Sequence, residues 1–271
     1  MNYRRLRTML AILIFAALNA AFLDVSGWCL QNCAWLAKWQ LVPAFLALNA
    51  LALAVILGVT YFGGRYYCSI LCPLGIYQDV LGRLSRRLAK RRCAFKPART
   101  KWRFSALIVF VALGVCGFFN VASLIEPYGM YGRIANNLFA PIVQNVNNWL
   151  DLYCSQHDSY AFGAVPVRPL SAWSLGIALV SFVAVSALAW KEGRGYCNTI
   201  CPVGTFLGMI GERSVYRVQL NADNCRSCQK CVQVCKCNCI DIANKRVDTS
   251  RCVVCGRCWE ACQFKGISYR R

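Results

Sequence analysis

The chain has 271 residues, 58% of them hydrophobic, and a formal net charge of +20. So high an apolar fraction is typical of a membrane protein with a small soluble part. With His157 as the single histidine, a haem held by two histidines is excluded, and the sequence has no C-x-x-C-H run, Gly-rich nucleotide fingerprint or P-loop.

Four apolar runs are long enough, at roughly 20 residues, to cross a bilayer as helices. They are residues 8–26, 41–62, 104–125 and 172–190, and none contains Lys or Arg. The sequence therefore predicts an all-α integral membrane protein with four transmembrane helices. We interpret the first run as a retained helix, because no small-residue cleavage site follows it cleanly.

The basic residues predict an orientation. Of the 31 Lys and Arg residues, 28 lie in residues 1–8, 63–103 and 191–271. By the positive-inside rule, both termini and the middle loop are cytoplasmic, in a bacterial inner membrane. No recognition motif accompanies the charge, so nucleic acid is not an expected partner.

A cysteine motif occurs twice. "YCSILCPLG" at 67–75 returns as "YCNTICPVG" at 196–204, each after a basic, Gly-containing approach ("GGRY", "GRGY"). The spans thus form two repeated hairpins, which we expect side by side around a pseudo-twofold axis along the membrane normal. That arrangement would bring four cysteines to one depth: Cys68, Cys72, Cys197 and Cys201.

The second cysteine of each pair is expected at a helix N-cap, with Pro73 or Pro202 just inside the helix. The positive helix end lowers a thiol pKa and favours a thiolate or an anionic cluster. Three interpretations stay open: ligands to an additional iron–sulfur cluster, thiol–disulfide redox chemistry, or small buried residues at a helix corner.

Two further segments are expected at the membrane surfaces. Residues 73–92 predict an amphipathic helix lying on anionic lipid, with one apolar face formed by Leu74, Tyr77, Leu81, Leu84 and Leu88. Residues 126–153 are too polar to span, so we expect them to lie in or re-enter the outer interface.

The C-terminal segment carries the most specific motif, C-x2-C-x2-C-x3-C, twice. This spacing is that of two-cluster bacterial ferredoxins, in which the fourth cysteine of each run ligates the other [4Fe–4S] cluster. The first predicted site is Cys225, Cys228, Cys231 and Cys262, and the second is Cys252, Cys255, Cys258 and Cys235.

The tail departs from that pattern after each fourth cysteine, where Lys236 and Gln263 stand in place of the usual proline. "CKCNC" also offers Cys237 and Cys239 as alternative ligands to Cys235. About 58 residues bury little core, so the clusters are expected to hold the tail folded.

The outer side carries acids and cysteines. Asp24 and Glu126 stand at outer ends of spans and are candidate proton acceptors from a quinol, or else lie in headgroup water. His157 is expected to be solvated. In an oxidising periplasm Cys29 and Cys33 are expected to form a disulfide, leaving Cys154 over, while Cys93 and Cys116 have no partner at motif spacing.

Together, the four spans, the two C-x3-C-P motifs and the doubled tail motif resemble the NapH-type membrane ferredoxins, quinol dehydrogenase components, and the membrane core of the related NosR proteins. The resemblance covers nearly the whole chain. It implies an inner-membrane protein that takes electrons from quinol and passes them through iron–sulfur centres to a partner redox protein.

The predicted organisation has four parts: a first hairpin (1–72), a basic linker (73–103), a second hairpin (104–212) and an α+β ferredoxin-like domain (213–271). The leading hypothesis is membrane electron transfer from quinol through two or more [4Fe–4S] clusters. The alternatives are a thiol- or metal-handling assembly factor and a membrane anchor whose tail docks a soluble oxidoreductase.

Overall fold

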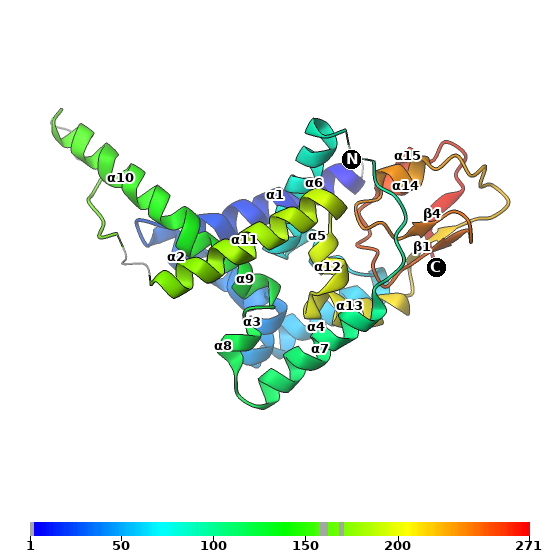
Figure 1. The fold of residues 1–271 in the computed structure, drawn as a ribbon, viewed down its shortest axis with the longest axis horizontal. Coiled ribbons are helices and arrows are strands. Elements are labelled where there is room, and N and C mark those ends of the chain that lie inside the picture. The colour runs from blue at the N-terminus through cyan, green and yellow to red at the C-terminus, as the bar shows by residue number, and fades with distance from the viewer. Residues whose placement is uncertain (1–2, 91, 158–161, 168–170) are drawn as a thin grey trace.

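The computed structural model describes residues 3–90, 92–157, 162–167 and 171–271. The chain is mostly helical, and its C-terminal tail (residues 213–271) lies at one end of the helical body, next to the start of α1 (Figure 1). The other end carries α10, which extends away from the body.

The helices of the first half are α1 (Tyr3–Phe22), α2 (Trp28–Cys33), the 3-10 helix η1 (Ala34–Trp39), α3 (Leu41–Leu46), α4 (Ala50–Gly63), α5 (Tyr67–Ile70) and α6 (Pro73–Leu88). Those of the second half are α7 (Thr100–Val115), α8 (Phe119–Ala122), α9 (Pro127–Ile134), the π-helix η2 (Ala135–Phe139), α10 (Ala140–Ser155), α11 (Ala172–Glu192), α12 (Gly195–Thr199) and α13 (Pro202–Glu212).

Two of the four expected spans are single helices long and apolar enough to cross a membrane, α1 and α11. The other two are interrupted. Asn49 accepts a hydrogen bond from the Ala52 backbone at 3.1 Å, so a new helix starts inside the run 41–62. In the run 104–125, α7 ends before Gly117, whose φ of 79° suits glycine. The average hydropathy of each run concealed these local breaks.

Helix α6 also packs on another helix, and its expected contact with anionic lipid stays a prediction. Its small and polar face, which includes Gly82 and Ser85, packs against α11, and Ser85 donates to the Trp190 carbonyl at 2.7 Å. Small residues allow two helices to approach closely. Leu84 and Leu88 of that stripe are exposed.

The tail holds two small antiparallel sheets and two short helices. Strands β1 (Arg217–Leu220) and β4 (Ile267–Arg270) pair with Val218 opposite Tyr269, and β2 (Ile240–Asp241) pairs with β3 (Arg246–Val247). The helices are α14 (Lys230–Val234) and α15 (Arg257–Ala261). The cysteine loops lie between these elements.

Candidate iron–sulfur centres

Each C-x3-C-P motif forms a sharp corner between two helices. The first cysteines, Cys68 and Cys197, lie on the short helices α5 and α12. The second are N-cap residues of α6 and α13, each followed by its proline, as the sequence predicts. Cys201 Sγ also accepts the Gly204 backbone N–H at 3.2 Å. The helix N-termini therefore present amide donors to these sulfurs.

The four thiols of the corners are buried together; we call them the cysteine quartet (Cys68, Cys72, Cys197 and Cys201). Gln78 of the first repeat donates to Cys197 Sγ of the second at 3.1 Å, so the sulfurs of both repeats lie at one place. Burial raises the pKa of Cys72, and the thiols of Cys197 and Cys68 raise it further, which corrects the lowering expected from the helix end alone. Burial and the other three thiols raise the pKa of Cys201 in the same way. The structure thus brings together the four cysteines that the repeat predicts to share one depth.

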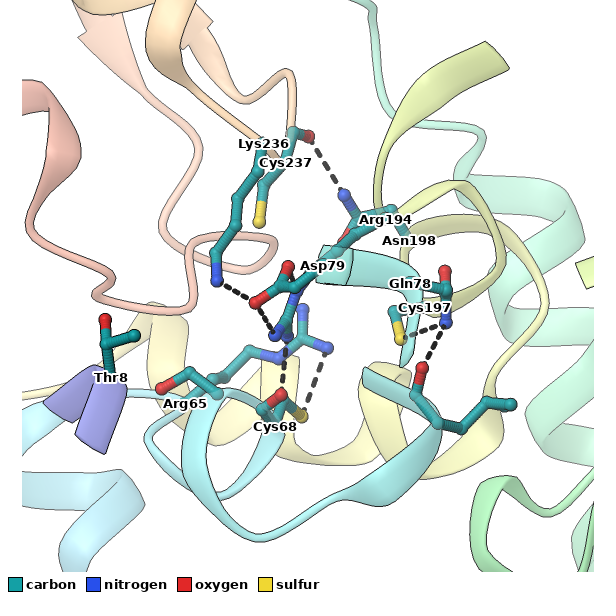
Figure 2. A network of polar contacts seen from close by, with 12 residues as sticks. Thr8, Arg65, Cys68, Gln78, Asp79, Arg194, Cys197, Asn198, Lys236 and Cys237 are labelled. Carbon is teal, nitrogen blue, oxygen red and sulfur yellow. Dashed lines mark hydrogen bonds and ion pairs between the residues drawn. The ribbon is translucent and has the colours of Figure 1, made fainter. Parts of the chain in front are cut away.

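Two fully buried arginines cross between the repeats (Figure 2). Arg194 of the second repeat donates to the Cys68 carbonyl of the first at 2.6 Å. Arg65 of the first repeat reaches over Gly204 of the second, where an added Cβ would lie 2.8 Å from its Nη2. Each motif glycine therefore makes room for the arginine of the opposite repeat.

The two arginines differ in their counter-charges. Arg194 makes a two-pronged ion pair with Asp79, at 2.8 Å from each carboxylate oxygen, and Lys236 of the tail bonds the same carboxylate. Arg65 donates to the Ser250 carbonyl at 2.9 Å and faces Cys68 Sγ at 3.6 Å. Within the described part of the chain, Arg65 has no carboxylate partner.

The tyrosine before the first cysteine of each motif is hydrogen-bonded to the residue at the far end of an apolar run, Gln40 before run 41–62 and Ile125 at the end of run 104–125. Tyr67 donates to Gln40 Oε1 at 2.8 Å, and Tyr196 donates to the Ile125 carbonyl at 2.6 Å. Glu126, next in the chain, caps α9 by accepting the backbone N–H groups of Tyr128, at 2.9 Å, and Gly129. Burial raises the pKa of Glu126 to about 7, despite those hydrogen bonds.

Glu126 is thus buried beside the second corner and not, as expected, at the outer end of a span. Asp24 and His157 have more ordinary environments. Asp24 is half-buried and accepts the backbone N–H groups of Ser26 and Leu30, which ties the turn before α2. His157 is exposed and packs on the Tyr153 ring, with centroids 4.9 Å apart. The role of Asp24 and Glu126 as proton acceptors from a quinol stays a prediction.

The expected disulfide between Cys29 and Cys33 is not formed, because both are free thiols of α2. Helical residues four apart have Cβ atoms about 5–6 Å apart, whereas a disulfide needs about 3.5–4.5 Å. Cys93, Cys116 and Cys154 are also free. None of these five cysteines lines the hollows of the tail.

The tail cysteines surround two hollows. One is lined by the four cysteines of the first predicted site and by apolar residues that include Leu220 and Ile242. The other is lined by the four of the second predicted site together with the alternatives Cys237 and Cys239. Cys239 Sγ lies 3.6 Å from Cys235 Sγ, so the choice between them is not made by proximity.

The donor sets fit iron–sulfur clusters rather than single ions. Thiolates in an apolar setting are the ligands that such clusters take. Among the residues described, no three Cys, His, Asp or Glu side chains converge on one ion-sized point.

The second tail site lies against the quartet. Asn198 of the quartet corner donates to the Cys237 carbonyl at 2.9 Å, and the Arg194 backbone N–H donates to the Lys236 carbonyl at 3.1 Å. Lys236, in the place of the usual proline, therefore fastens the tail to the membrane repeats. The sequence analysis did not identify Arg65, Arg194 and Asp79 as site residues. The repeated "GGRY" and "GRGY" segments, which contain the two arginines, were the available signal.

Comparison with known proteins agrees with these sites. A family model described as a 4Fe-4S binding domain matches residues 45–92 and 174–217, which contain the two corners. A second model of the same description matches residues 245–268 of the tail.

Among curated proteins, the chain is 24% identical to the putative electron transport protein YccM of Escherichia coli over 83% of this chain and 57% of YccM. It is 26% identical to the ferredoxin-type protein NapH of the same organism over 82% of this chain and 67% of NapH. It is 27% identical to the methylamine utilization ferredoxin-type protein MauN of Paracoccus denitrificans over 70% of this chain and 55% of MauN. The chain thus spans roughly half to two thirds of the length of these relatives. No solved structure matches.

Proposed function

Because the chain belongs to the NapH-type family of ferredoxin-type electron-transport proteins, we propose that it is a membrane protein that oxidises quinol and delivers single electrons to a partner redox protein. In this proposal the quartet holds an iron–sulfur cluster in addition to the two of the tail. A [4Fe–4S] cluster at each site supplies one-electron chemistry.

The observation that carries the proposal is the charge balance around the quartet. Four buried cations, Arg7, Arg65, Arg194 and Lys236, lie at the quartet corner, and Asp79 is the one carboxylate that pairs with them among the described residues. A buried charge without a counter-charge costs several kcal/mol, on the order of 3–5 when a partner is missing. The buried cations outnumber the carboxylates that pair with them, so the site calls for negative charge at the sulfurs.

This balance also ranks the alternative functions. Four thiolates around an iron–sulfur cluster form an anion, which satisfies Arg65. Disulfides are neutral and would leave Arg65 unpaired, which argues against a cycle of thiol–disulfide chemistry. Neutral thiols that only fill space at a helix corner would also leave Arg65 without a counter-charge.

The topology belongs to the proposal. We place α1 and α11 across the inner membrane, with both termini and residues 73–103 on the cytoplasmic side, because 28 of the 31 basic residues lie in residues 1–8, 63–103 and 191–271. The hydrogen bonds of the Leu41 N–H with Tyr67 and of the Ile125 carbonyl with Tyr196 bring the far ends of the runs 41–62 and 104–125 back to the quartet corners, so we do not assign α4 and α7 as spans. Quinol is the lipid-soluble donor, and residues 213–271 face a soluble partner.

The test is iron and acid-labile sulfide per chain, with EPR after reduction by quinol. We expect about 12 irons in the wild type, four per cluster. Replacement of the quartet cysteines by Ser is expected to leave about eight with the tail signals unchanged, whereas the control Cys116→Ser keeps all of them. Eight irons in both proteins would refute the quartet cluster, and wild-type clusters that quinol does not reduce would refute quinol oxidation.

A further inference from the structure

An aromatic hollow lies where the tail meets the first membrane helix. Its volume is about 500 Å³, and it is lined by Tyr3, Tyr66, Lys265, Ile267, Ser268, Trp259 and Tyr269. The volume lies in the range of about 300–1,000 Å³ that is usual for small-molecule sites. We propose that this aromatic hollow binds the ring of the quinol. The inference rests on the proposed function and gives it a location.

The walls of the hollow adjoin the second tail site. Tyr3 donates to the carbonyl of Val254 at 2.5 Å, and Val254 lies between Cys252 and Cys255. Trp259 directly follows Cys258. A ring in the hollow is therefore separated by single residues from three of the predicted ligands of that site.

The hollow also lies at the level where membrane helices end. Tyr3 begins α1, one of the two helices long and apolar enough to span a membrane. Tyr66 follows the end of α4. A quinol whose isoprenoid chain stays in lipid can present its ring at this level without leaving the bilayer.

The aromatic side chains are arranged as a ring site and not as a belt that anchors helices in headgroups. Trp259 and Tyr269 are stacked, with centroids 5.8 Å apart and planes 28° apart, and both belong to the tail. Tyr3 packs on Trp259 at 5.4 Å. Belt tyrosines direct their hydroxyls to headgroups, whereas Tyr269 donates to the Gly63 carbonyl at 3.0 Å.

The polar residues of the lining suit the quinol hydroxyls. Lys265 is exposed, and within the described residues its ammonium makes no ion pair. Ser268 adds a hydroxyl. Oxidation of one bound quinol to quinone releases two electrons and two protons. The iron–sulfur sites of the proposed function accept the electrons one at a time. The protons enter the water on the tail side, and this inference therefore replaces the prediction that Asp24 and Glu126 accept them.

The test uses the full holoprotein in lipid nanodiscs, with a short-chain benzoquinone and a short-chain naphthoquinone as probes. Equilibrium binding of each quinone is measured, together with the KM for cluster reduction by its quinol. Tyr3→Leu and Trp259→Leu are expected to weaken binding and raise KM about tenfold, the loss of one good ring contact and its buried area, at unchanged iron content. Trp173→Leu, an exposed tryptophan of α11 outside the hollow, is the control and leaves both unchanged.

Ser268→Trp fills the hollow without removing a ring and must abolish binding, which covers the case in which a leucine variant loses iron. The inference is overturned if Ser268→Trp and Tyr3→Leu bind quinone as the wild type does while Glu126→Gln binds it more weakly. That result would still agree with quinol oxidation at another place. Quinones that neither bind nor reduce the wild-type holoprotein refute the proposed function, and the inference with it.

Discussion

The two repeats have the same parts at their corners but differ at one position that faces the tail. Seven residues after its second cysteine, the first repeat carries Asp79 and the second carries Gly208. Asp79 pairs with Arg194 and Lys236. At Gly208 a Cβ would lie 2.5 Å from the Ser250 carbonyl, so the tail backbone occupies that space. The shared parts gather the quartet, and the difference fixes the tail on it.

The largest effect is expected from Asp79→Asn, which removes the carboxylate that pairs directly with Arg194 and Lys236 and costs on the order of 3–5 kcal/mol. Burial acts to raise the pKa of Asp79, but the two cations outweigh it and hold that pKa well below its usual range. The stabilisation is therefore present at neutral pH and is lost as the pH falls below about 4.

Thermal unfolding in detergent at several pH values measures this difference. Wild type and Asp79→Asn are expected to differ by a constant amount above about pH 5 and to converge at lower pH. Asp223→Asn, on the exposed tail surface, is the control. Equal unfolding of wild type and Asp79→Asn at neutral pH would show that this ion pair does not hold the tail.

An intermediate effect is expected from the motif glycines. A methyl group at Gly204 would lie 2.6 Å from the Cys197 carbonyl and 2.8 Å from Arg65 Nη2; at Gly75 it would lie 2.6 Å from the Cys68 carbonyl but 3.4 Å from Arg194 Nη1. Both Ala variants are expected to lose about 1–3 kcal/mol through overpacking, Gly204→Ala the more. Gly58→Ala, with no atom within 4 Å of the new methyl, is the matched control; a loss in it as large as in the two motif variants contradicts the crossed-arginine account.

The helix caps of this comparison and, through the repeat, the quartet could be predicted from the sequence, whereas the ion pairs that fix the tail could not. Cysteine followed by Pro73 or Pro202 indicates an N-cap, because proline suits the first helical turn, and the structure has both. The pairing of Asp79 with Lys236 joins residues 157 apart in the chain, and no local pattern reports it. Asn49 and Gly117 were visible breakers, but averaging over a window of about 20 residues removes them.

The smallest effect, and the one with an informative sign, is expected from Arg65→Met. If the quartet holds an anion, Arg65 is its counter-charge, and Met lowers the reduction potential of that site, because reduction adds negative charge beside a lost cation. We expect a shift of about 1–1.5 kcal/mol, roughly tenfold in the reduction equilibrium, in an EPR-monitored titration. Arg194→Met removes a cation that Asp79 balances, so we expect it to shift the reduction potential less.

If the quartet holds no anion, Arg65→Met instead removes an unpaired buried charge and raises the unfolding temperature. A more stable protein with unchanged EPR signals would therefore contradict the cluster and favour the corner of small buried thiols.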